Sequence, residues 1–87
     1  MAYQEIRYDE IRAGDVILFH GAKELVTETV DEGESEYYPG ERVIRFDVEP
    51  YDEEAVKILG KFYSRGTYGG VGWLKVGLVH RGIQNPQ

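Results

Sequence analysis

Only one stretch of this chain, residues 52–59, has the residue pattern of an α-helix, and this restricts the fold more than any other feature. Asp52 can cap its N-terminus, Gly60 suits its C-terminal end, and Val56 and Leu59 lie on one apolar stripe. Parallel strands need long crossover connections, which are usually helical. A chain with a single helix of about two turns is therefore expected to pair its strands antiparallel.

Apolar residues that alternate with polar ones predict strands in most of the remaining chain. The clearest examples are residues 42–49 and 73–80, each with one apolar face. Residues 3–8 and 61–65 are also expected to be strands, and residues 16–20 and 25–30 a hairpin. The residues that we expect to share one core, with Val56 and Leu59 closing it, are Ile44, Phe46, Val48, Leu74, Val76 and Leu78.

Two segments have the composition of connections. Residues 31–41 contain turn formers, five acids and no aliphatic residue, which predicts a mobile loop. Residues 66–72 contain four glycines, which predicts a turn or a bulge. Residues 82–87 are expected to be a frayed tail.

Together these elements predict an α+β fold that is mostly β. We expect a small antiparallel bent sheet or open barrel of five to six strands, with the helix at about residues 52–59 closing one end. The length favours one domain, residues 1–87. The chain has no apolar run long enough to span a bilayer, and its first residues do not have the pattern of a signal peptide.

No catalytic or metal-binding pattern is found in the sequence. The absence of cysteine excludes disulfides, zinc fingers and thiol nucleophiles, and it fits a reducing, cytoplasmic compartment. The glycines at 66–72 are not followed by Lys-Ser/Thr, as a phosphate loop requires. His20 and His80 have no metal-ligand spacing, and the acids at 47–54 do not match a calcium loop. We therefore expect a protein that is not an enzyme and that uses no cofactor or metal.

The charge is divided unevenly along the chain. The total is −6, but residues 1–60 contain sixteen acids and six bases, which gives 6 − 16 = −10. Residues 61–87 contain four bases and no acid, which gives +4. The overall sign argues against generic binding to nucleic acids, whose phosphates require cations, and against docking on an anionic membrane.

The acids of the first part are interspersed with tyrosines, a residue type that is enriched at protein interfaces. This combination favours a non-enzymatic interaction protein that docks on a cationic surface of another protein, such as a nucleic-acid-binding protein. In one version of the hypothesis the carboxylates mimic phosphates, as in small inhibitors encoded by phages, and the protein then acts in the host cytoplasm. The predicted partner-binding residues are Asp31, Glu32, Glu34, Glu36, Tyr37, Tyr38, Asp47, Glu49, Tyr51, Asp52, Glu53 and Glu54.

Three alternatives remain open from the sequence. A small barrel could bind RNA or single-stranded DNA through basic and aromatic residues of its C-terminal strands. The residues of that platform would be Lys61, Tyr63, Arg65, Tyr68, Trp73 and Lys75. The chain could also be a subunit of a larger, for example viral, assembly. Finally, the acidic surface could serve solubility alone.

Overall fold

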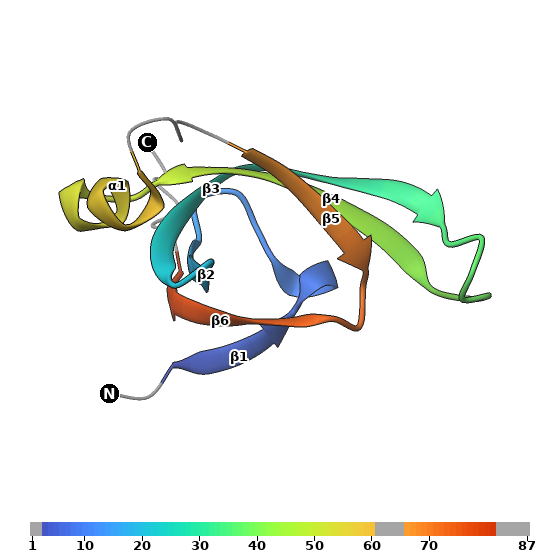
Figure 1. Cartoon of the computed structure of the whole chain (residues 1–87). Helices are drawn as coiled ribbons and strands as arrows, with labels where there is room; N and C mark the ends of the chain where they lie inside the picture. The colour runs from blue at the N-terminus through green and yellow to red at the C-terminus, as the bar shows by residue number, and fades with distance from the viewer. Residues whose placement is uncertain (1–2, 61–65, 82–87) are drawn as a thin grey trace, which may run out of the picture.

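The computed structural model describes residues 3–60 and 66–81, which form one bent antiparallel sheet (Figure 1). The strand order is β1-β6-β2-β3-β4-β5, so the sheet does not close and β1 and β5 lie at its edges. This confirms the expected mostly β fold with one short helix. The strands are β1 (Gln4–Arg7), β2 (Val16–Phe19), β3 (Ala22–Glu34), β4 (Arg42–Pro50), β5 (Gly66–Val71) and β6 (Lys75–His80). The predicted strand at 61–65 and the predicted tail at 82–87 lie outside the described residues.

The predicted β2–β3 hairpin forms, but its turn is shorter than expected, because β3 begins at Ala22 and not at residue 25. Phe19 pairs with Ala22 across a two-residue turn, His20 and Gly21, whose φ angles are 58° and 76°. Positive φ at both central residues is the signature of a type I′ turn, whose twist matches that of the flanking strands. This turn therefore sets the register of the hairpin.

The next hairpin is longer than predicted. β3 continues to Glu34, and Asp31 pairs with Ile44 on β4 while Glu34 pairs with Arg42. The prediction of a loop over residues 31–41 is therefore wrong for residues 31–34. Acidic residues are usually poor strand formers, but here Asp31 and its neighbour Glu32 each bind an arginine of β4. The turn itself is confined to residues 35–41.

The glycine-rich segment is a strand rather than a turn or a bulge. β5 pairs with β4 from Val71 opposite Val43 to Gly66 opposite Val48. A Cβ atom at Gly69 would lie 2.9 Å from the backbone oxygen of Ile44, so glycine is needed here for the close approach of the two strands. The turn that follows contains Trp73, which therefore precedes β6 and is not part of it.

This close approach makes Gly69→Ala a sharp test of the β5 assignment. The new methyl group would be forced against the backbone of β4, so we expect a loss of about 1–3 kcal/mol in the free energy of unfolding. Gly77→Ala in β6 is the matched control, because a Cβ atom there has no neighbour nearer than 3.7 Å. Urea denaturation of both variants measures the effect. Equal stability of the two variants would contradict the assignment of residues 66–71 to a strand beside β4.

The core lies inside the bend of the sheet. Phe46 and Val48 of β4 are fully buried, and the predicted inward positions Ile44, Val76 and Leu78 are buried as well. Leu74 is only half-buried, because it lies in the turn before β6. The main cluster consists of Ile6, Ile11, Ile17, Val26, Phe46, Val48, Val76 and Leu78, with Tyr8, Phe19 and Tyr68 packed against it.

The helix α1 (Glu53–Leu59) has the predicted ends but not the predicted role. The Asp52 side chain accepts a hydrogen bond from the Ala55 N–H at 2.9 Å, and the chain leaves the helix at Gly60 with φ 96°. Val56 is exposed and Leu59 is half-buried, so the prediction that these two residues close the core is wrong. The helix lies beside one end of the β3–β4 ribbon and buries only its small residue Ala55 (Figure 1).

Candidate interaction site

The turn between β3 and β4 presents two tyrosines to solvent. The buried Ser35 hydroxyl accepts hydrogen bonds from the backbone N–H groups of Tyr37 and Tyr38, each at 3.1 Å. The Ser35 N–H donates to the Glu41 carbonyl at 2.7 Å, and the Glu41 N–H donates to the Tyr38 carbonyl at 3.0 Å. These four bonds fix the shape of the turn and leave the Tyr37 side chain 83% exposed.

Trp73 lies against this turn, although it is far away in the sequence. The rings of Tyr38 and Trp73 are perpendicular, with their centroids 5.8 Å apart, and both side chains are partly exposed. The Trp73 turn is held by the Gly72 N–H, which donates to the Arg42 carbonyl at 2.8 Å, and by the Tyr8 N–H, which donates to the Leu74 carbonyl at 2.7 Å. We call the three residues Tyr37, Tyr38 and Trp73 the aromatic tip.

Carboxylates are concentrated in the segment that carries Tyr37 and Tyr38. Residues 31–42 contain five acids and one base, a net charge of 1 − 5 = −4. Glu32 binds Arg45 of β4 at 3.1 Å, and Glu34 accepts a hydrogen bond from the Gly40 N–H at 3.0 Å. Within the described part of the chain, the exposed side chain of Glu36 makes neither a hydrogen bond nor an ion pair. The tip therefore keeps an excess of negative charge beside exposed rings.

One carboxylate of this region has a displaced pKa. Arg42 Nε donates to both oxygens of Asp31 at 3.1 Å, and the Gly33 N–H donates to the same carboxylate at 2.9 Å. These bonds favour the ionised form and lower the pKa of Asp31 below its ordinary value of 3.8. The pair is half exposed to solvent, so its contribution to stability is small and salt-dependent.

Replacing Arg42 by alanine is expected to raise the pKa of Asp31 towards 3.8, because the largest cause of the lowering is removed. In the wild type the folded pKa lies below the unfolded one. The Asp31 contribution to stability is therefore complete above the unfolded pKa and is lost as the pH falls through the folded pKa. A carboxyl-carbon NMR titration measures this shift, with Arg7→Ala as a control that leaves Asp31 unchanged. An unaltered Asp31 titration in Arg42→Ala would show that the cross-strand pair does not form.

The structure brings half of the predicted partner-binding residues together and separates the others from them. Asp31, Glu32, Glu34, Glu36, Tyr37 and Tyr38 gather at the outer end of the β3–β4 ribbon. Helix α1, with Glu53 and Glu54 exposed and Asp52 as its cap, lies at the opposite end of the molecule (Figure 1).

The remaining three predicted residues lie on or just after β4. Asp47 accepts from Arg45 at 2.9 Å and from the Thr67 hydroxyl at 3.0 Å, so its charge is engaged in the middle of the sheet. Glu49 is half-buried near the helix end. Tyr51 follows β4, and its hydroxyl lies 3.3 Å from His80 Nε2. The twelve predicted residues thus extend from the outer end of the ribbon along β4 to the helix, and Arg45 links Glu32 to Asp47.

Trp73 lies at the aromatic tip, although the sequence predicts it as part of the RNA-binding platform. Among the other members of the predicted RNA-binding platform, Lys61, Tyr63 and Arg65 lie outside the described residues. Tyr68 packs against Phe46 and Phe19 in the core. The pairing of residues 66–71 with β4 could have revealed the position of Trp73, because this pairing carries the next turn to the outer end of the ribbon.

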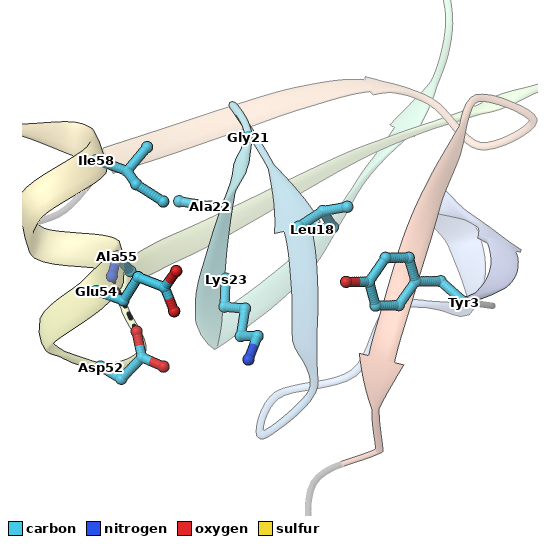
Figure 2. A pocket seen from close by; sticks show the side chains of 9 residues that line it. All are labelled: Tyr3, Leu18, Gly21, Ala22, Lys23, Asp52, Glu54, Ala55 and Ile58. Atoms are coloured by element: carbon cyan, nitrogen blue, oxygen red, sulfur yellow. Dashed lines mark hydrogen bonds between the residues drawn. The ribbon is translucent and has the colours of Figure 1, made fainter. Parts of the chain in front are cut away.

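A small hollow lies at the other end, between helix α1 and the β2–β3 hairpin (Figure 2). Its volume is about 150 Å³, which suffices for a few water molecules or a single side chain. In Figure 2, Ile58 and Ala55 line it from the helix, and Tyr3 and Leu18 lie on the far side of Lys23. The Asp52 carboxylate at its rim already caps the helix. Its other charged lining residues are Lys23 and Glu54.

Two fully buried carboxylates, Asp15 and Glu24, are structural features that the sequence analysis did not identify. Asp15 accepts from the Arg12 N–H at 2.9 Å and from the Arg81 guanidinium at 3.1 Å, which ties the turn before β2 to the end of β6. Glu24 lies 3.3 Å from His20 Nδ1. Such partners offset the cost of removing a charge from water.

The two histidines do not form a common site. His20 follows β2, whereas His80 pairs with Val16 at the opposite end of that strand. Over residues 3–60 and 66–81, no group of three histidine or carboxylate side chains could hold a metal ion. In the same ranges, no helix is long and apolar enough to cross a membrane.

Comparisons with known proteins identify no relative. No protein-family model matches the chain, and searches of the curated proteins and of the solved structures give no significant match. The candidate site is therefore inferred from its geometry and charge alone.

Proposed function

We propose that this protein is a non-enzymatic binding module that docks on a basic surface of another protein through the aromatic tip and the carboxylates around it. The observation that carries the proposal is the contact between Tyr38 and Trp73, two partly exposed rings held by ordered turns beside an acidic segment, residues 31–42, whose own net charge is −4. Exposed apolar area that is held rigidly and bordered by charges is characteristic of protein–protein interaction sites.

The two components of the tip support binding in different ways. Unpaired carboxylates such as Glu36 attract a cationic partner over several ångströms and raise the rate of encounter. The rings of Trp73 and Tyr38 supply contact area that loses little conformational entropy on binding, because the turns already fix their backbone. Charge would steer the partner, and the aromatic residues would retain it.

The basic surface that fits this tip is the kind that nucleic-acid-binding proteins use for phosphates, so the phosphate-mimicking inhibitor is the version that we favour. The cysteine-free composition suits action in a reducing cytoplasm, which would be that of the host if the protein is viral. Direct binding of RNA or single-stranded DNA has weaker support, because Tyr68 is partly buried against the core and the turn that brings Tyr38 to Trp73 is rich in acids.

An affinity capture with matched variants tests the proposal. The tagged protein is incubated with a lysate of its native host, in parallel with Tyr38→Ala/Trp73→Ala and with Tyr51→Ala, which removes an exposed tyrosine at the other end of the molecule. We expect a partner that the wild type and Tyr51→Ala retain and the tip double variant loses. The protein should also pass unretained through a heparin column. Retention on heparin, or capture that ignores the tip substitutions, would contradict the proposal.

A further inference from the structure

We propose that the aromatic tip recognises an arginine side chain of its partner, by contact of the guanidinium group with Trp73 and pairing with a neighbouring carboxylate. This inference rests on the proposed function and specifies the chemical group that the site recognises. The observations behind it are the exposed Trp73–Tyr38 pair and Glu36 of the Tyr38 turn, whose exposed side chain has no bonding partner among residues 3–60 and 66–81.

Arginine fits these groups better than lysine does. Tryptophan is the strongest aromatic acceptor for a cation, and the planar guanidinium can stack on it while its N–H groups still face outward. Those N–H groups match the two oxygens of a carboxylate, which a lysine ammonium contacts only as a point charge. Glu36 and Glu41 belong to the turn that also carries Tyr38. A site with an aromatic surface and adjacent carboxylates therefore discriminates in favour of arginine.

The other exposed aromatic residues of the described chain lack this combination. The Tyr51 ring lies against His80, with the ring centroids 5.6 Å apart, so its partner ring is an imidazole and not an indole. Tyr3 lies beside the hollow near Lys23. Neither place holds a tryptophan, which is the strongest aromatic acceptor for a cation. The tip is also the place where the only tryptophan of the chain is found, so its fluorescence reports directly on this site.

The test uses three synthetic peptides of equal length, octa-arginine, octa-lysine and octa-citrulline. Calorimetry at 0.15 M salt gives the affinities, and Trp73 fluorescence and NMR shifts of the Trp73 and Tyr38 rings locate the contact. We expect octa-arginine to bind about three-fold more tightly than octa-lysine, as cation–π contacts at exposed sites allow. Octa-citrulline, which keeps the planar group but not the charge, should not bind.

Variants separate arginine recognition from general attraction. In Trp73→Leu the affinities for octa-arginine and octa-lysine should become equal, and Tyr51→Leu should keep the three-fold preference. Tyr38→Leu, which leaves Trp73 in place, is expected to reduce the preference and serves as a second variant. Equal affinities of the wild type for both cationic peptides, or a preference that persists in Trp73→Leu, would overturn the inference. If a host partner nevertheless depends on the tip in the capture experiment, arginine recognition fails while the proposed function stands.

Discussion

Replacement of Phe46 by alanine is expected to bring the protein close to unfolding. The Phe46 ring is fully buried and lies edge-on to the rings of Tyr8 and Phe19, with centroids 5.1 and 5.6 Å away. Loss of such a side chain removes its hydrophobic burial and leaves a cavity, which together cost about 3–5 kcal/mol. Small domains have a total free energy of unfolding of only about 5–15 kcal/mol. Thermal and urea denaturation measure the loss.

The control for this prediction is Val56→Ala. The helix pattern assigns Val56 to the core, but the structure leaves its side chain exposed. Truncation of an exposed residue usually changes stability by less than about 0.5 kcal/mol. A large loss in Val56→Ala, or an unchanged midpoint in Phe46→Ala, would mean that the faces of α1 or β4 are assigned wrongly.

The second large effect is expected at the aromatic tip once a partner has been captured. Trp73→Ala removes the largest ring of the site, and truncation of such anchors costs about 2 kcal/mol or more. This corresponds to a dissociation rate about thirty-fold faster, since interface truncations act mainly on dissociation. Surface plasmon resonance with the immobilised partner measures this rate. Stability should hardly change, because Trp73 is partly exposed.

Charge reversal at the tip should act on association instead. Glu36→Lys is the cleanest change, because Glu36 makes no bond in the described part of the chain, whereas Glu32 and Glu34 also hold the hairpin together. We expect slower association, and a weaker effect as salt shortens the Debye length from ~10 Å to ~3 Å. Glu53→Lys makes the same charge change at the helix end. An equal effect of both reversals would point to net charge rather than to the tip.

The alternation of apolar residues predicted the fold well because it reports burial directly. Residues 42–49 lie in a strand whose buried positions follow the pattern, and Asp52 caps the helix as expected. The wrong predictions concern segments whose structure we inferred from their amino-acid composition alone. Asp31 and Glu32 extend β3 because arginines lie across the hairpin, and the glycines of β5 serve a close approach to β4. Both effects depend on partners that are distant in the sequence.

The site was predicted only in part for the same reason. The concentration of acids and tyrosines in residues 31–38 marked the turn correctly as a charged, aromatic segment. No local pattern indicates that Trp73 joins Tyr38, because their contact depends on the register of β5 against β4. Equally, nothing in the sequence showed that Glu53 and Glu54 would lie at the opposite end of the molecule. A run of charged residues predicts that a segment is exposed and charged. The order and register of the strands decide which of these segments lie on the same surface.

The most direct test of the proposed docking mode is amide hydrogen exchange of this chain, free and bound to its captured partner. If the aromatic tip is the contact, exchange should slow at residues 35–41 and 72–74 and stay unchanged along α1 (Glu53–Leu59). Slower exchange confined to α1 or to β6, with residues 35–41 unaffected by the partner, would show that binding takes place elsewhere on the molecule.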